Sequence, residues 1–429
     1  MDRRAFLTGA AIGGAAAISP SAWAGSIAQP GAAPALDDWP SVKRAFAIRG
    51  DSVHMAGFFL ASHPGPVRAA IERHRAGLDA DPHGYHQRNV RTFEIATREA
   101  AAEYLVTDPD LFAMTDSTTM GISLVYTGLQ LRPGDEIVTD THDHIVTHSA
   151  TQFAANRSGA SVRRVPLYED PSGVSVDSVV RRVEQAVTSR TRLLALTWVH
   201  SGTGVKLPVR RIADVVARVN ASRGPANRLL FALDGVHGFG IENVTVADLG
   251  CDFLIAGCHK WLFGPRGTGL VWAKADVWPL VRPTIPTFDR GWRVRPFDAL
   301  PHASKITPGG FHSFEHRWAL AEAFGFHRTL GKTRVAERVH TLNRRCKLGL
   351  ARLPKVKVAT PMDDSSSAGI VCFTVDGHSP AEALAGLEKQ SIIASTTPSF
   401  YRPAYVRLAP SLLTLEDDVD RAVEAVARL

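Results

Sequence analysis

The chain has 429 residues, of which 45% are hydrophobic, and it carries a formal net charge of +7. This composition is ample for a large core and predicts one large and one smaller domain. Because no dense run of lysines and arginines interleaved with aromatics occurs, the composition argues against nucleic acid as a partner. The four cysteines lack metal-ligand spacing and are too few for a disulfide scaffold, so we expect buried free thiols at Cys251, Cys258, Cys346 and Cys372.

The N-terminus has the features of a twin-arginine export signal. An arginine pair lies in Asp2-Arg3-Arg4-Ala5-Phe6-Leu7, an uncharged stretch continues to Ile18, and a small-x-small cleavage site follows at Ala22-Trp23-Ala24. The apolar stretch is shorter than the roughly 20 residues that span a bilayer, so no stable membrane anchor is expected. Removing residues 1–24 lowers the net charge from +7 to +6. We expect the Tat export machinery to deliver the mature protein to the bacterial periplasm; the alternative is a frayed basic terminus.

Apolar runs bounded by turn residues predict buried strands at residues 136–139, 162–167, 192–199, 229–234, 252–256 and 269–272. Between them, valines and isoleucines recur at helical spacing in residues 176–187 and 209–219. This alternation predicts a mostly parallel sheet with helices on its faces. Ligands of such sheets bind beyond the carboxyl ends of the strands. Asp234 stands at the end of one predicted strand and is therefore a candidate for a ligand contact.

The pattern changes after residue 279. Residues 279–310 are rich in Pro, Arg and aromatics and predict an irregular connection that forms part of the site wall. Residues 315–330 and the segment after Thr333 have helical patterns. The tail predicts strands at 370–375, 392–395 and 405–409, with helices that begin at the N-caps Ser379 and Thr414. We therefore expect a signal at 1–24, an N-terminal segment at 25–65 that joins the small domain, a large domain at 66–308 and a small α+β domain at 309–429.

Two short stretches indicate the chemistry. Asp234-Gly-Val-His237 ends one apolar run, and Cys258-His-Lys-Trp261 follows the next, before the glycine-rich Gly264-Pro-Arg-Gly-Thr-Gly269. An acid that holds a pyridinium nitrogen and a lysine that forms a Schiff base are what a pyridoxal phosphate (PLP) enzyme needs. Asp234 and Lys260 are 26 positions apart, which is enough for a strand, a turn and another strand. A nicotinamide-binding Rossmann motif is excluded because the glycine-rich segment has the wrong spacing and leads into a strand.

The chain resembles the class V aminotransferase group of fold-type I PLP enzymes, which includes cysteine desulfurases and isopenicillin N epimerase. The resemblance runs from about Gly84 to the C-terminus, and its epimerase-like branch is the most similar. Its strongest segments are Ser117-Thr-Thr-Met-Gly121, Leu131-Arg-Pro-Gly-Asp135, residues 191–209, Asp234–His237 and His259–Gly269. The resemblance implies the PLP-dependent transferase fold type I, an α/β fold with a large domain around a mostly parallel sheet. An export signal on this fold is also similar to that of exported PLP enzymes that tailor the siderophore pyoverdine.

The resemblance also assigns roles to residues. It implies that Lys260 carries the cofactor and that Asp234 pairs with the pyridine nitrogen. His237 and Ser201 fall beside the ring's phenolic oxygen, and His144 falls on the ring face. The phosphate is expected at Thr118, Thr119 and His259, with Gly257 in place of a serine of the desulfurases. Arg407 matches the arginine that binds the substrate α-carboxylate, and Ser313 matches a residue that reaches the phosphate of the partner subunit in a homodimer.

The site leaves several alternatives open. A metal site at His142, His144 and His148 is a minor alternative to the stacking role, because PLP chemistry needs no metal. Once an amino acid displaces Lys260, transamination, epimerisation and β-elimination all remain possible, and transamination is favoured only slightly. Residues 395–401 contain no cysteine, which argues against the persulfide mechanism of desulfurases. The expected substrate is an amino acid or an amino-acid residue of a peptide natural product; a PLP-fold binding protein that has lost catalysis is the other class considered.

Overall fold

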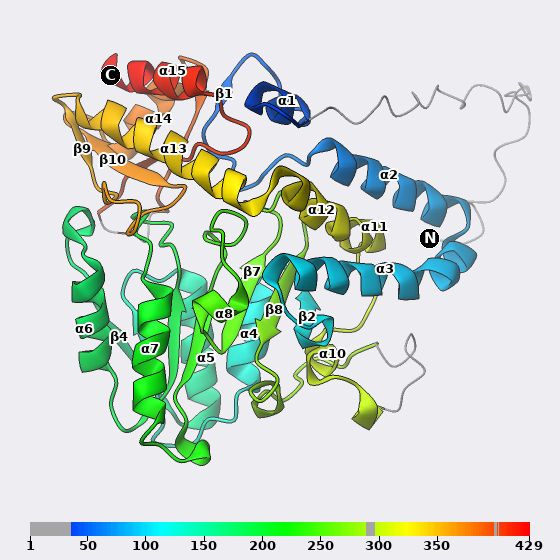
Figure 1. The fold of residues 1–429 in the computed structure, drawn as a ribbon. Helices are drawn as coiled ribbons and strands as arrows, with labels where there is room; N and C mark the ends of the chain where they lie inside the picture. Colours follow the sequence, from blue (N-terminus) through cyan, green and yellow to red (C-terminus); the bar gives the residue numbers. More distant parts are fainter. Residues whose placement is uncertain (1–35, 289–296, 399–400, 402) are drawn as a thin grey trace, which may run out of the picture. The chain divides into compact units, whose positions relative to one another are not determined.

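The computed structural model describes residues 36–288, 297–398, 401 and 403–429, so the predicted export signal lies outside the described residues. Residues from 35 onward form a single compact unit. Within it lie a seven-stranded, a four-stranded and a two-stranded sheet (Figure 1). The domain boundaries that we expect at residues 65 and 308 stay predictions.

The large sheet has the order β2-β8-β7-β6-β5-β3-β4, and every pair of neighbours is parallel except those that involve β8. This confirms the expected α/β fold with a mostly parallel sheet. The sequence predicted each of these strands except the first. Their bounds are β2 (Phe112–Thr115), β3 (Glu136–Asp140), β4 (Ser161–Val165), β5 (Thr191–Thr197), β6 (Leu230–Asp234), β7 (Phe253–Gly257) and β8 (Gly269–Ala273).

Helices cover both faces of this sheet. Along β5, Leu193 and Ala195 pack into one hydrophobic cluster, and Leu194 and Leu196 pack into another, as the two-residue period of a strand requires. The first cluster includes α4 (Thr118–Gly128), α5 (Ile145–Ser158) and α10 (His302–Ile306). The second includes α3 (Pro82–Leu105), α6 (Val176–Ala186), α7 (Val209–Asn220), α8 (Val246–Leu249) and α12 (Leu320–Leu330).

The predicted helical segments at 176–187 and 209–219 are α6 and α7, whose valines face the sheet. The predicted helices at 315–330 and after Thr333 are α11 (Phe314–Trp318), α12 and α13 (Lys332–Ala351). The sequence analysis did not predict α1 (Trp39–Arg44), α2 (Gly65–Ala80), α3, α5, α8 or α10. Short 3₁₀ turns complete the set at η2 (Pro109–Leu111), η3 (Pro171–Gly173), η4 (Pro225–Asn227), η5 (Trp278–Leu280) and η6 (Phe297–Ala299).

The C-terminal part forms an antiparallel sheet in the order β12-β13-β10-β9. Its strands are β9 (Val356–Val358), β10 (Val371–Val375), β12 (Ser395–Thr396) and β13 (Val406–Leu408), and α14 (Pro380–Glu388) and α15 (Glu416–Ala427) accompany it. The predicted strand at 392–395 is divided. Its first half, β11 (Ile392–Ile393), pairs in parallel with β1 (Val53–His54), so the N-terminal segment contacts the C-terminal part of the chain.

Two local predictions have different outcomes. Ser379 caps α14 as expected, because its Oγ accepts the N–H of Glu382 at 3.3 Å while the Glu382 carboxylate accepts the N–H of Ser379 at 2.8 Å. Thr414 is not the cap of α15, because the helix begins one residue later with Leu415 at the N-cap. The Thr414 hydroxyl instead accepts the N–H of Ser411 at 3.0 Å and closes the preceding turn.

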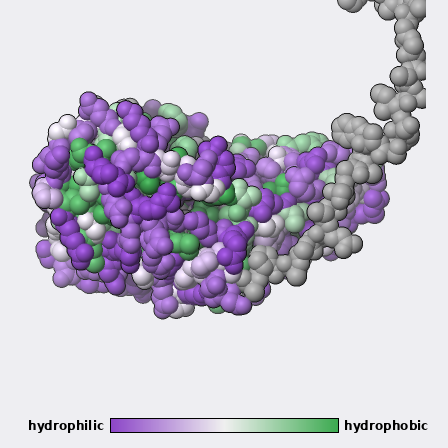
Figure 2. Space-filling model, turned by 90° about the horizontal axis from the view of Figure 1, so that it is seen from above, coloured by the Kyte–Doolittle hydropathy of each residue, from purple (hydrophilic) through white to green (hydrophobic). Residues whose placement is uncertain are grey.

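The described surface is mixed in character. Seen from above in Figure 2, hydrophobic residues lie in small patches between hydrophilic ones. Among the residues that the structure describes, no helix has the length and apolarity needed to cross a membrane.

Candidate functional site

The carboxyl ends of the five parallel strands β2, β3, β5, β6 and β7 bring the predicted site residues together. Because these strands run in the same direction, the segments that follow them lie at one edge of the sheet. A cavity of about 240 Å³ opens at this edge. It is lined by Ser117, Thr118, Thr119, Ile122, His144, Val146, Thr197, Ser201, Asp234, Val236, His237, His259 and Lys260.

All predicted site residues except Ser313 and Arg407 are among these lining residues. The described residues between 279 and 310 do not line the cavity, so our prediction that this connection forms part of the site wall is wrong for the residues that the structure describes. The described part of this connection packs elsewhere. Its helix α10 lies against β2 and belongs to the hydrophobic cluster that contains α4 and α5. Residues 289–296 of this connection lie outside the described residues.

Lys260 lies between an acid and an imidazole. Its Nζ is 3.3 Å from Nε2 of His237, whose Nδ1 accepts the indole N–H of Trp261 at 3.2 Å. Burial lowers the pKa of Lys260 from 10.5 to about 8. The negative charge of Asp234 opposes this shift, and the positive charge of Arg407 adds to it. About a tenth of the amine is therefore neutral at pH 7, far more than for an ordinary lysine, and the neutral form is the one that a nucleophilic lysine requires.

Asp234 ends β6 in the interior of the molecule and is 3% exposed. Burial raises its pKa to about 6, although the N–H of Val236 donates to its Oδ1 at 3.1 Å and the charge of Lys260 also opposes the shift. A buried carboxylate of this kind gains most from a cationic partner, because an opposite charge restores the stabilisation that burial removes. A protonated pyridine nitrogen is such a partner.

The opposite end of the cavity suits a phosphate. Ser117 caps α4 by accepting the N–H of Met120, and the N–H groups of Thr118 and Thr119 lie in the first helical turn, where they have no intrahelical acceptor. Thr118 Oγ1 accepts the N–H of Gly257 at 2.8 Å, which leaves its own proton free to donate. Nδ1 of His259 is buried and has no hydrogen-bond partner among the described residues.

Gly257 permits close packing at this end. A Cβ at this position would lie 3.0 Å from both Thr118 Oγ1 and His259 Cε1. The absence of the serine found in desulfurases therefore keeps the threonine and the histidine close together. Unpartnered donors at one end, a buried acid at the other and a lysine beside them fit PLP, and Thr118, Thr119, His259, Asp234 and Lys260 would hold it.

His144 and Ser201 occupy the wall between these ends. His144 caps α5 by accepting the N–H of Val146 at Nδ1, and burial, followed by the charge of Lys260, lowers its pKa to about 4. The ring is therefore neutral at neutral pH. The backbone carbonyl of Ser201 accepts a hydrogen bond from Arg407 Nη1 at 3.0 Å. Ser201 thus links the cavity to the C-terminal sheet.

Arg407 lies behind Ser201, on β13, and is 6% exposed. Its guanidinium is 4.7 Å from the ring centroid of Phe58, and its Nε is buried with no hydrogen-bond partner among the residues that the structure describes. No carboxylate among the described residues pairs with this guanidinium. A buried cation that lacks an anion is costly unless a ligand supplies one, so the geometry supports the expected role in carboxylate binding.

Ser313 is not brought to the cavity of its own chain. It is exposed at the start of α11, and among the described residues its hydroxyl accepts no capping N–H. Its expected role in the partner subunit's site stays a prediction.

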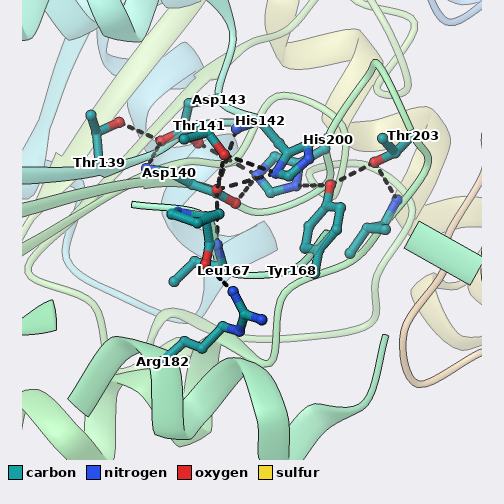
Figure 3. A network of polar contacts seen from close by, with 12 residues as sticks. Thr139, Asp140, Thr141, His142, Asp143, Leu167, Tyr168, Arg182, His200 and Thr203 are labelled. Atoms are coloured by element: carbon teal, nitrogen blue, oxygen red, sulfur yellow. Dashed lines mark hydrogen bonds and ion pairs between the residues drawn. The ribbon is translucent and has the colours of Figure 1, made fainter. Parts of the chain in front are cut away.

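The sequence analysis missed a polar network centred on Asp140, Asp143 and His200 (Figure 3). His200 Nε2 lies 3.5 Å from both Asp140 Oδ2 and Asp143 Oδ1, and its Nδ1 is 2.9 Å from the hydroxyl of Tyr168. Asp143 also accepts the N–H of Thr197, a lining residue, at 2.7 Å. Burial disfavours charge on His200, but Asp143 and Asp140 outweigh it and raise the histidine's pKa. The network fixes the end of β5 and adds negative charge near Asp234.

The three histidines considered as metal ligands have separate partners. His142 stacks on Tyr168 with ring centroids 3.9 Å apart, His144 caps α5, and His148 Nε2 is 2.8 Å from the carbonyl of Asp140. In the part of the chain that the structure describes, no three metal-ligating side chains converge.

Comparisons with known proteins agree with this arrangement. The family model described as Aminotransferase class-V matches residues 68–413. Isopenicillin N epimerase from Streptomyces clavuligerus is 25% identical over 385 residues, which cover 85% of this chain and 92% of the epimerase. A cysteine desulfurase from Cronobacter sakazakii is 25% identical over 387 residues, which cover 85% of this chain and 89% of the desulfurase.

Solved structures show the same fold. A lysine-to-alanine variant of C-DES with glycine covalently linked to its PLP cofactor has a TM-score of 0.80 at 21% identity, covering 90% of this chain and 98% of that chain. The complex of the cystine C–S lyase C-DES with its product cysteine persulfide has a TM-score of 0.78 at 22% identity, covering 91% and 99%.

Proposed function

Because the chain belongs to the aminotransferase class-V family and is a PLP-dependent enzyme of that family, we propose that it acts on the amino group or Cα of an amino acid. The observation that carries this proposal is a buried amine, Lys260, whose pKa is lowered in part by the charge of a buried guanidinium, Arg407, which pairs with no carboxylate among the described residues. An α-amino acid brings a carboxylate for the guanidinium and a Cα proton for the neutral amine to remove. When bound, PLP supplies the electron sink that makes a proton at Cα removable.

The chain's own residues then divide the work. Arg407 binds and orients the α-carboxylate through its planar fork. Asp234 holds the charge of the ring nitrogen. Lys260 is an amine that can take the Cα proton, because its lowered pKa leaves it partly neutral. Half-buried His144 and buried Ser201 line the wall and reduce the access of water to these groups.

Transamination-type chemistry is favoured by the state of the imidazoles. Epimerisation needs a proton donor on the face of Cα opposite to the base. His144 has a pKa lowered to about 4, chiefly by burial, and burial lowers the pKa of His237 and His259 as well. Neutral imidazoles of such low basicity are poor proton donors at neutral pH, which favours a reaction in which Lys260 alone moves the proton. Epimerisation and β-elimination remain the alternatives.

A persulfide mechanism finds no support in the thiols. Cys251, Cys258, Cys346 and Cys372 are all buried and unpaired, which confirms the expectation of free thiols. Burial raises the pKa of Cys372, the one that pairs in register with Arg407, to about 12. A buried neutral thiol is a poor nucleophile. A reaction at the amino group is therefore preferred to sulfur transfer.

The first experiment is the visible spectrum of the purified protein, followed by borohydride reduction and peptide mapping. We expect a yellow protein with the phosphopyridoxyl group fixed on Lys260. A panel of amino acids and peptides, scored for oxo acid, inverted Cα and eliminated β-substituent, then identifies the reaction. A protein that takes up no PLP would sink the proposal and favour a binding protein that has lost catalysis.

We also propose that the enzyme is exported by the Tat machinery and matures a secreted peptide natural product. The support is the arginine pair Arg3-Arg4 with the cleavage site before Gly25. Export after folding suits an enzyme that captures its cofactor in the cytoplasm. We expect processed protein in the periplasmic fraction, and retention of the variant in which Arg3 and Arg4 are both lysine. Equal export of both proteins would contradict the proposal.

The enzyme is further proposed to be a homodimer in which Ser313 reaches the phosphate site of the other subunit. Phe311, two residues before Ser313, is 87% exposed, which is unusual for so large an apolar side chain. Sedimentation should show a dimer for the wild type and a shift toward monomer for Phe311→Glu. A monomeric wild type that binds PLP would contradict the shared site.

A further inference from the structure

Trp261 contacts the residue that faces the lysine. Its indole is 2% exposed, and Nε1 donates to His237 Nδ1 at 3.2 Å. An indole nitrogen has a proton to give and no lone pair to accept with, so its hydrogen bond has only one possible direction. The accepting nitrogen of His237 therefore carries no proton.

The second nitrogen of His237 must then hold the ring's proton. Burial, followed by the charges of Lys260 and Arg407, lowers the pKa of His237 well below its ordinary value, so the imidazole is neutral. A neutral imidazole has one N–H, which lies on Nε2 when Nδ1 is an acceptor. Nε2 is 3.3 Å from Lys260 Nζ. We infer that Trp261 is a positioning residue: it fixes His237 in the Nε2–H tautomer and so presents a hydrogen-bond donor to the lysine amine.

The surroundings hold the indole in this orientation. The ring of Phe58 stacks on Trp261, with centroids 6.4 Å apart and planes 27° apart, and also lies 5.7 Å from the ring of His237. A Cβ at Gly369 would lie 2.5 Å from the indole, so the backbone there approaches the ring as closely as glycine allows. Rotation of the indole would need both neighbours to move.

The consequence for Lys260 rests on the proposed function. An N–H donor stabilises the neutral amine through its lone pair and offers nothing to an ammonium group. In the other tautomer, Nε2 is an acceptor and would stabilise the ammonium instead. Other charged or titratable groups also act on Lys260 and His237. Asp234 raises the pKa of Lys260 and so favours its ammonium form, whereas Arg407 lowers it. Arg407, His144 and His259 all lower the pKa of His237. Trp261 thus works with burial, and against Asp234, to keep the lysine reactive.

The tautomer can be measured without substrate or cofactor. In protein labelled with ¹⁵N-histidine and freed of PLP, ring N–H correlations distinguish the two tautomers, and His237→Gln identifies the signal of His237. We expect the Nε2–H form in the wild type. The Nδ1–H form in the wild type would overturn the inference by itself, whether or not any variant folds. Since no reaction is involved, this failure is distinct from a failure of the proposed chemistry.

A variant tests the role in the lysine's reactivity. In Trp261→Phe, the pH midpoint for covalent capture of PLP should rise by about one pH unit, because an imidazole acceptor can now bind the ammonium. Trp198→Phe is the matched control: this buried indole packs against the neighbouring Gly238 but makes no hydrogen bond to His237. It should leave the midpoint unchanged.

The double variant completes the test. A glutamine at position 237 can donate with its amide whatever lies at position 261. The shift caused by Trp261→Phe should therefore disappear when it is introduced into His237→Gln. A shift of the same size in both backgrounds, or an equal shift in Trp198→Phe, would show a general packing effect and overturn the positioning role.

Discussion

The two halves of the site are built in different ways. The cofactor half, from Ser117 to Lys260, consists of segments that directly follow parallel strands of one sheet, and its groups are held largely by backbone geometry. The substrate half combines Arg407 from the C-terminal sheet with Phe58 from the N-terminal segment, and these residues meet only through side-chain packing. Substitutions in the cofactor half disturb the sheet that holds it. In the substrate half, single side chains can be replaced independently, so relatives with different substrates are expected to differ there.

The largest effect is expected for the lysine of the cofactor half. Lys260→Ala should abolish covalent capture of PLP and lower turnover by about 10³-fold or more, since it removes both the nucleophile and the base. Borohydride reduction and peptide mapping give the readout. Lys357→Ala, which alters an exposed lysine on β9, is the control and should retain full labelling. Labelling of another lysine in Lys260→Ala at the wild-type rate would contradict the assignment.

The guanidinium of the substrate half should separate binding of substrate from binding of cofactor. Arg407→Ala should raise KM for an amino-acid substrate about a hundredfold, because charge-assisted bonds to a buried carboxylate are lost. Its PLP capture and visible spectrum should remain those of the wild type. Arg407→Lys keeps the charge but not the fork and should recover only part of the loss. If PLP capture fell as much as substrate affinity, the division into two halves would be wrong.

The sequence predicted the cofactor half because its signals are local. Asp234 and Lys260 follow recognisable apolar runs, and Thr118 stands at the start of a helix, so the chemistry and the position are both visible in a few consecutive residues. Phe58 gave no such signal: it lies in a short irregular stretch, and only its contacts with Arg407, His237 and Trp261 reveal its role. The Asp143–His200 pair was missed for the same reason, since its partners come from the ends of different strands.

The misplaced elements have physical causes of the same kind. Residues 392–395 form one apolar run in sequence, yet tertiary pairing divides them between β1 and β13. Thr414 has the residue type of a cap, but its hydroxyl is already used by Ser411, so α15 begins later. Local propensity cannot decide such cases, because the competing hydrogen bond comes from the tertiary structure.

The pH dependence of cofactor capture tests the electrostatics of the cofactor half. The folded pKa of Lys260, about 8, is lower than the ordinary value of 10.5, so the folded state binds fewer protons between these pH values. This lysine's contribution to stability therefore increases as pH rises from about 8 to 10.5. Capture of PLP needs the neutral amine, so its rate should rise about tenfold per pH unit below pH 8 and level off above it. The rate at which PLP reacts with a small free amine, measured over the same pH range, corrects for the titration of PLP itself. If the rate of capture levelled off only near pH 10, the lowered pKa of Lys260 would be contradicted.

The smallest effect is expected for the aromatic ring that joins the two halves. Phe58→Leu removes the ring beneath the Arg407 guanidinium, and since cation–π contacts contribute about 0.5–1 kcal/mol, KM should rise roughly threefold. The adjacent Phe59 is 69% exposed and provides a matched control, because Phe59→Leu makes the same chemical change one residue away without touching the site. Steady-state kinetics on both variants give the comparison. An equal change in KM for the two would show that the ring acts through general packing of the N-terminal segment, whereas a change confined to Phe58→Leu would place this segment in the substrate half.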